Sequence, residues 1–145
     1  MQNITDNFLN NIIEFSKKQF STEHKHQAKR CLLDYLGATI AGAQMLSKQT
    51  NYLLNSLGLA EGDILIIGNN YKTSVERASF INGLNSHIAE LDDGVISGIV
   101  HPGAPIFSSL IPYAQKENVS GDDFIRGIIV GYEVATSLAD VIQPS

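Results

Sequence analysis

The sequence predicts a mostly helical, bundle-like protein with one short strand or hairpin near residues 64–72. Apolar residues recur at helical spacing along most of the 145 residues, and residues typical of helix starts precede several of these stretches. Only residues 64–68 (ILIIG) combine β-branched residues with flanking turn residues. Because 43% of the residues are hydrophobic, the chain can fill a core, and we expect one domain over residues 1–145.

The first part of the chain reads as three helices, over residues 4–20, 22–43 and 47–58. The second has its apolar residues on one stripe and ends in small residues, GATIAGA at 37–43. Small side chains let another helix approach closely, so we expect a neighbouring helix to cross there.

A fourth helix follows the strand. Thr73 and Glu76 have the spacing of a capping box, in which both side chains satisfy free N–H groups at a helix start. The helix is expected to continue to about Leu91, with His87 at one border of its apolar stripe. The predicted stripe comprises Phe80, Ile81, Leu84, Ile88 and Leu91.

Two further helices complete the prediction. Pro102 suits the first turn of a helix that begins near His101, and Ser120 with Asp123 gives a second capping signal. The last helix, about residues 122–142, is apolar over most of its circumference. Such a helix needs burial on several sides, so we expect neighbours beyond those that this chain supplies.

Charge and composition exclude several classes of function. The net charge is −5 and no run of Lys or Arg forms a basic stripe, so binding to nucleic acid or to an anionic membrane is not expected. Cys31 is the single cysteine, which fits a reducing compartment. The N-terminus lacks the pattern of a signal peptide, and the longest aliphatic run has four residues, ILII. The sequence therefore predicts a cytoplasmic protein.

Ionisable residues concentrate between positions 87 and 101. The carboxylates of Glu90, Asp92 and Asp93 are flanked by His87 and His101. A histidine can move a proton near neutral pH, and a helix start beside His101 would offer free N–H groups to a substrate carboxylate. His101 is therefore the candidate base, although an exposed loop histidine would give the same pattern.

The acids leave several interpretations open. They could bind a metal, act as a general base or only end a helix, where acids oppose the helix dipole. Motifs for metal, phosphate or hydrolase sites (HExxH, CxxC, an EF-hand loop, GxGxxG, GxxxxGK[ST] and GxSxG) are absent from the sequence. We therefore predict no metal site, and spacing alone names no reaction.

Four stretches in order resemble the MmgE/PrpD family, which includes 2-methylcitrate dehydratase, cis-aconitate decarboxylase and iminodisuccinate epimerase. They are CLLDYLGATIAGA (31–43), ERASFINGLNSHIAELDDG (76–94), HPGAPIFSSLIPYAQ (101–115) and SGDDFIRGIIVGYEVATSLAD (120–140). The shared pattern is an acid-rich H-x-x-(acid)-x-D-D segment, then HP-(G/S), then GYE. Together these stretches cover nearly the whole chain.

The resemblance implies an all-helical domain and proton abstraction next to a carboxylate, followed by loss of water or carbon dioxide, or by epimerisation. It places His101 in the active site as the proton-transfer residue, with Glu90 lining it. Asp92, Asp93, Gly94 and His87 complete the expected substrate-binding set. No cofactor is implied. The family commonly has aspartate at the position of Glu90 and threonine at that of Gly94, so the choice of carboxylic acid stays open.

The resemblance also implies that residues 1–145 form only the N-terminal portion of the helical domain. Family substrates are di- or tricarboxylates, and the sequence has no Lys or Arg between Arg77 and Lys116 to balance their charge. We therefore expect the missing portion of the domain to supply the positive side of the site, and an isolated chain without activity unless a separate polypeptide completes it. The expected partner is a second copy in a homodimer or a complementing chain. The alternative is a helical dimerisation or interaction module without catalysis.

Overall fold

The computed structural model describes residues 3–57 and 62–142. Within them the chain forms six α-helices and one antiparallel hairpin, which confirms the predicted fold class. The elements are α1 (Ile4–Ser16), α2 (Thr22–Met45), α3 (Ser47–Leu57), β1 (Ile64–Leu65), β2 (Lys72–Thr73), α4 (Val75–Ile88), α5 (Gly103–Glu117) and α6 (Gly121–Ile142). The predicted end of the third helix at Gly58 lies outside the described residues.

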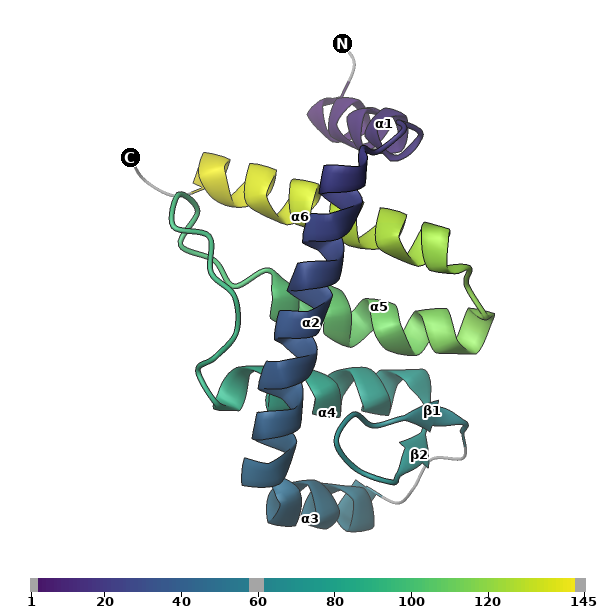
Figure 1. Ribbon diagram of the computed structural model, residues 1–145, viewed down its shortest axis with the longest axis vertical. Coiled ribbons are helices and arrows are strands. Elements are labelled where there is room, and N and C mark those ends of the chain that lie inside the picture. The colour runs from purple at the N-terminus through teal and green to yellow at the C-terminus, as the bar shows by residue number, and fades with distance from the viewer. Residues whose placement is uncertain (1–2, 58–61, 143–145) are drawn as a thin grey trace.

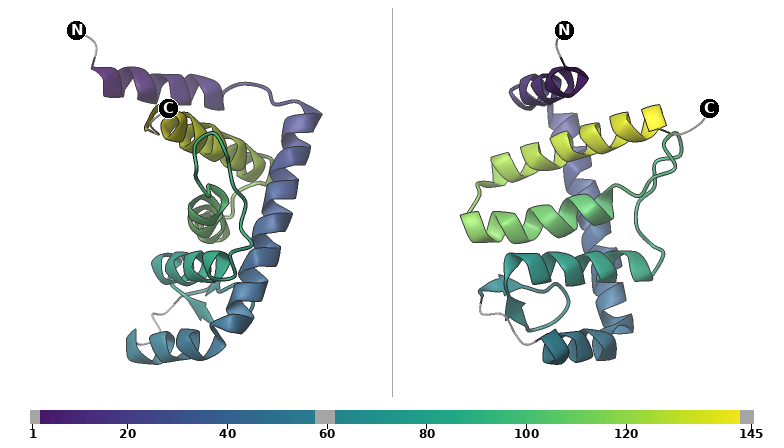
Figure 2. Two further views of the ribbon diagram at one scale, coloured as in Figure 1. Left: turned by 90° about the vertical axis from the view of Figure 1, so that its left-hand side faces the viewer. Right: turned by 180° about the vertical axis from the view of Figure 1, so that it is seen from behind.

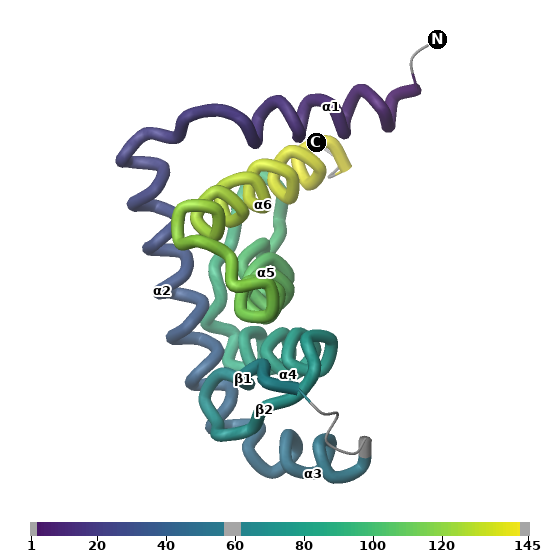
Figure 3. The backbone as a smooth tube through the Cα atoms, turned by 90° about the vertical axis from the view of Figure 1, so that its right-hand side faces the viewer, coloured from purple at the N-terminus to yellow at the C-terminus, as the bar shows by residue number. Residues whose placement is uncertain are grey.

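The long helix α2 organises the molecule. Helices α4, α5 and α6 are stacked along it, each crossing its axis, and all three lie on the same side (Figures 1 and 2). Helix α1 packs against α6 at one end of the stack, while α3 and the hairpin lie at the other (Figure 3). Each of α4, α5 and α6 therefore presents one end to the same side of the molecule, and the loop joining α4 to α5 runs along that side.

Local sequence explains how α2 begins and how it packs. The Ser21 hydroxyl accepts a hydrogen bond from the amide of His24 at 3.2 Å, which satisfies one of the free N–H groups at the helix start. Near the other end, α4 crosses so closely that a methyl group on Gly42 would overlap the carbonyl oxygen of Asn85. The predicted close approach at the small-residue segment is confirmed.

The main core lies where α2, α5 and α6 meet. It is built on Ala28, Tyr35, Phe107 and Ile128, and the rings of Tyr35 and Phe107 are 5.0 Å apart. Phe107 is fully buried. A second, smaller cluster joins α3, the hairpin and α4 through Leu54, Ile64, Ile66, Ala78 and Ile81. The main core thus packs α5 against α2 and α6, and the second cluster packs the first half of α4 against α3 and the hairpin.

Two predictions for α4 are wrong. Its N-cap is Ser74, which accepts from the amide of Arg77, whereas Thr73 belongs to β2. Of the predicted apolar stripe only Ile81 is buried; the buried face is otherwise made of small or polar residues, Ala78, Asn82, Asn85 and Ser86. Where α4 crosses α2 at Gly42, its buried residues are small or polar, whereas Phe80 and Leu84 are exposed on its other face.

Helix α4 also ends earlier than predicted, at Ile88 rather than near Leu91. Glu90 adopts a left-handed backbone conformation with φ of 51°, which cannot continue a right-handed helix. Asp92 and Asp93 therefore lie in the following loop and not at the helix end. Helix α1 similarly stops at Ser16 instead of residue 20, and the strand predicted over 64–68 is limited to Ile64–Leu65.

The last helix matches its prediction closely. The amide of Asp123 donates to the Ser120 hydroxyl at 3.2 Å, so the predicted cap is formed. Of its 22 residues only Ile128 is fully buried. Within residues 3–57 and 62–142, every helix is too short or too polar to serve as a membrane span.

Candidate active site

The site is built on the loop between α4 and α5. This loop leaves α4 just after His87, extends to the C-terminal end of α6 and returns to the start of α5 (Figure 1). A short antiparallel bridge between Val95 and Val100 closes its tip, where Gly98 lies so near Ala139 that a methyl group on the glycine would be 2.6 Å from the alanine Cβ. The loop is thus held at both of its ends and at its tip.

The predicted base, His101, stands one residue before the N-cap of α5. Its Nδ1 lies 2.7 Å from the main-chain carbonyl oxygen of Asp93, and its side chain is 53% exposed. Because a carbonyl oxygen only accepts hydrogen bonds, Nδ1 carries the hydrogen. When the ring is neutral, its basic lone pair is therefore on Nε2. The contact directs one nitrogen inward and leaves the other free for proton transfer.

Asp92 lies between the two histidines. Its Oδ2 is 2.9 Å from Nδ1 of His87 and 3.7 Å from Nδ1 of His101, and its side chain is only 3% exposed. The two imidazole rings meet edge to face, with centroids 5.8 Å apart. The hydrogen bond to Asp92, together with its negative charge, raises the pKa of His87 above its usual value of 6.5. The structure thus brings together three of the predicted residues.

Asp93 is fixed by hydrogen bonds from two other elements. The Tyr132 hydroxyl donates to its Oδ2 at 2.6 Å, and the amide of Gly103 donates to its Oδ1 at 2.9 Å. Tyr132 belongs to the GYE segment, which entered the sequence analysis only as part of the family resemblance. Next to it, Gly131 packs closely against α5, because a methyl group on Gly131 would lie 3.1 Å from Ile106. The role of the adjacent tyrosine depends on a contact across 39 positions, which spacing does not reveal.

The two remaining predicted residues, Glu90 and Gly94, each lie beside one of the two histidines. Glu90 is 3.9 Å from Nε2 of His87, and its side chain is 78% exposed. A methyl group on Gly94 would lie 3.8 Å from Cε1 of His101, so the glycine leaves one edge of that ring uncovered. Positive φ is uncommon for glutamate, and strained residues of this kind cluster at functional sites.

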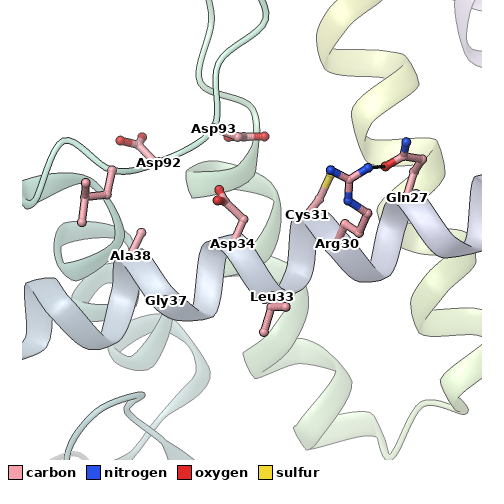
Figure 4. Close-up of a pocket in the computed structure, with 10 residues that line it drawn as sticks. Gln27, Arg30, Cys31, Leu33, Asp34, Gly37, Ala38, Asp92 and Asp93 are labelled. Atoms are coloured by element: carbon pink, nitrogen blue, oxygen red, sulfur yellow. Dashed lines mark hydrogen bonds between the residues drawn. The ribbon is translucent and has the colours of Figure 1, made fainter.

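An open hollow of about 730 Å³ lies between α2 and the loop. Figure 4 shows Gln27, Arg30, Cys31 and Asp34 on the side of α2 that faces Asp92 and Asp93. Leu33, Gly37, Ala38 and Leu91 complete its lining. Sequence reasoning missed this wall, because α2 is about 60 positions from the motif (Arg30 to Asp92 spans 62). The fold brings one cation, Arg30, into a hollow that also holds three aspartates.

Burial and neighbouring groups set the ionisation of Cys31, which lines this hollow, and of Tyr132 on α6. Burial raises the pKa of the Cys31 thiol, so the thiol is less reactive than a free cysteine at neutral pH. Burial raises the pKa of Tyr132 far above its usual value, and the hydrogen bond to Asp93 and the charge of that carboxylate raise it further. Tyr132 therefore stays a hydrogen-bond donor. Within the described part of the chain, no three His, Cys, Asp or Glu side chains are grouped to hold a metal ion.

Comparison with known families gives a match to the MmgE/PrpD N-terminal domain over residues 8–145. The match covers α2, α4, the loop with His101, α5 and α6, which together contain every residue of the site described above. Comparisons with curated proteins and with solved structures give no significant match.

Proposed function

The chain belongs to the MmgE/PrpD family, and on this basis we propose that it forms the N-terminal part of a lyase acting on a small di- or tricarboxylate. The reaction resembles that of 2-methylcitrate dehydratase. A proton leaves the carbon next to a carboxylate, and its bonding electrons form a double bond as hydroxide departs and is protonated to water. Decarboxylation and epimerisation begin from the same proton transfer.

The contact between Nδ1 of His101 and the carbonyl of Asp93 is the observation that carries this proposal. With the hydrogen on Nδ1, the Nε2 atom of the neutral ring carries a free lone pair. The same contact holds the half-exposed ring in place. A general base needs a fixed position and a free lone pair. His101 is therefore assigned the proton transfer.

The other predicted residues form the surroundings of this base. Gly94 and His87 lie beside the ring of His101, and Glu90 lies beside His87. We assign these three residues to substrate contact, while Asp92 and Asp93 support the two histidines from within. The left-handed conformation of Glu90 supports a functional role for this residue. A glycine would end the helix here without backbone strain, so the strained glutamate needs a reason other than helix termination.

Charge indicates that further residues complete the site. Asp34, Asp92 and Asp93 outnumber Arg30 in the hollow. A substrate carboxylate brought to about 4 Å from an uncompensated aspartate would be repelled by about 4 kcal/mol at an effective dielectric constant of about 20. A substrate with two or three carboxylates therefore needs additional cations. We propose that residues 1–145 are an incomplete domain and that a further segment or a second chain supplies these cations.

Exposed apolar side chains support the same proposal. Four apolar side chains on α4 or just after its end are 41% to 62% exposed: Phe80, Leu84, Ile88 and Leu91. Ser79, Phe80, Gly83, Leu84, His87 and Ile88 also line a mostly apolar hollow of about 400 Å³ with Leu46. Adjacent exposed apolar residues of this kind mark a surface that another protein segment covers.

The test is turnover of 2-methylcitrate, cis-aconitate and iminodisuccinate, followed by NMR spectroscopy. The purified chain is assayed alone and together with the C-terminal part of an MmgE/PrpD enzyme, supplied as a separate polypeptide. We expect no turnover alone and turnover of at least one acid in the mixture. Robust turnover by the chain alone would contradict the incomplete-domain proposal, and no turnover in either case would contradict the proposed reaction.

A second candidate function is an interaction module that forms dimers without catalysis. The observation in its favour is the exposed apolar face of α4. Sedimentation velocity of the chain and of a Phe80→Lys, Leu84→Lys variant separates the alternatives. The interaction module predicts a dimer that the variant abolishes, whereas a monomer that binds no hydrophobic dye contradicts it. In either case we propose a cytoplasmic location, supported by the single cysteine, which fits a reducing compartment.

A further inference from the structure

Asp93 uses all of its acceptor groups to join three parts of the site. Its carboxylate accepts from the Tyr132 hydroxyl of α6 at 2.6 Å and from the Gly103 amide of α5 at 2.9 Å. Its main-chain carbonyl accepts from Nδ1 of His101 at 2.7 Å. The side chain of Asp93 is thus held by two helices, while its backbone holds the proposed base.

Both bonds to the carboxylate have a structural reason to persist. Hydrogen bonds to an ionised acceptor are about twice as strong as neutral ones. Gly103 supplies one of the amides that a helix start leaves unpaired, and a methyl group there would lie 2.6 Å from Oδ1 of Asp93. Tyr132 stays protonated, because burial and the nearby carboxylate both oppose its ionisation. Neither donor is lost near neutral pH.

We propose that Tyr132 is a positioning residue, which holds Asp93 so that its carbonyl keeps neutral His101 protonated on Nδ1 and basic on Nε2. The catalytic consequence rests on the proposed function, but the tautomer itself does not. Without the tyrosine hydroxyl, the carboxylate of Asp93 keeps only its hydrogen bond from the Gly103 amide and can rotate about that hydrogen bond. The carbonyl then moves relative to the ring, and the Nε2–H tautomer competes.

The tautomer can be measured by NMR of the chain labelled with ¹⁵N-histidine, because a protonated and an unprotonated ring nitrogen have very different chemical shifts. Spectra are recorded at a pH where the histidines are neutral, and His101 is assigned with a His101→Asn variant. We expect the wild-type chain to show His101 protonated on Nδ1. A wild-type His101 protonated on Nε2 overturns the proposal at once.

The variant Tyr132→Phe removes only the hydroxyl, and Tyr52→Phe on the exposed face of α3 is its matched control. In Tyr132→Phe the two tautomers of His101 are expected to mix, so the ¹⁵N chemical shifts of its two ring nitrogens should move toward each other. In Tyr52→Phe both chemical shifts should stay at their wild-type values. Circular dichroism checks that both variants fold. A folded Tyr132→Phe chain with the wild-type tautomer contradicts the role of the tyrosine.

A second pair of variants serves if Tyr132→Phe does not fold. Asp93→Asn keeps an acceptor for Gly103 and a polar group for Tyr132, whereas Asp93→Ala keeps neither. The proposal predicts that Asp93→Asn retains the Nδ1–H tautomer and that Asp93→Ala loses it; retention in both contradicts it. If the tautomer responds as expected but His101→Asn does not reduce turnover in the completed enzyme, the proposed function fails and the positioning stands.

Discussion

The crossing of α2 and α4 can be tested with two glycines that lie five positions apart on one helix. A methyl group on Gly42 would overlap the carbonyl oxygen of Asn85 and lie 2.7 Å from its carbonyl carbon, whereas one on Gly37 would meet nothing within 4 Å. The substitutions Gly42→Ala and Gly37→Ala therefore make the same chemical change in α2 with and without a steric conflict.

The expected magnitudes follow from two opposing effects. Alanine in a helix interior is about 1 kcal/mol more favourable than glycine, so Gly37→Ala should raise the free energy of unfolding by about that amount. At Gly42 the two nearest conflicting atoms belong to the main chain of Asn85 and cannot rotate away, which places the overpacking cost at about 3 kcal/mol, the upper end of its usual range. After the helix-propensity gain, Gly42→Ala should lower the free energy of unfolding by about 2 kcal/mol.

The assay is urea unfolding of both variants and the wild type, followed by circular dichroism. The two variants should differ by about 3 kcal/mol, which for a chain of this size separates their melting temperatures by about 6–12 °C. A Gly42→Ala chain as stable as wild type would show that α4 does not cross α2 at this position. The end of α4 that carries His87 would then be misplaced as well.

Three further predictions use the same assay. Phe107→Ala should cost about 3–5 kcal/mol, since it empties a fully buried site at the centre of the main core; a cost below about 1 kcal/mol would contradict that location. Glu90→Gly should raise stability by about 1 kcal/mol and Glu90→Ala should not, because only glycine adopts the left-handed conformation without strain; equal effects would refute it. The raised pKa of His87 means that its ion pair with Asp92 stabilises the fold fully below about pH 6.5 and is lost as the pH rises above that value. His87→Gln should remove up to about 1 kcal/mol of this pH dependence, and an unchanged pH profile would contradict the pairing.

The sequence predicted the helices well and their contacts less well. Capping residues such as Ser21 and Ser120 act within one turn, so local spacing reveals them. The apolar stripe of α4 was mispredicted because periodicity identifies an apolar face but not which face the neighbouring helix covers. Here the close crossing at Gly42 selects the small polar face.

For the candidate site, sequence reasoning identified residues close in the chain and missed those that the fold brings near. His87, Glu90, Asp92, Asp93, Gly94 and His101 lie within 15 positions, and the structure gathers them around the α4–α5 loop. Tyr132 and Arg30 come from α6 and α2, and no spacing rule connects them to the motif. Their roles depend on the stacking of helices across α2.

The central claim is that His101 transfers the substrate proton, and exchange of that proton with solvent deuterium tests it most directly. The chain completed by the C-terminal part of a family enzyme is incubated with substrate in D₂O, and deuterium uptake is followed by NMR. Because a positioned general base contributes about 10²–10⁴-fold, His101→Asn should slow uptake by at least about 100-fold, whereas His26→Asn, an exposed histidine on α2, should not. Equal uptake rates in the two variants would contradict the account.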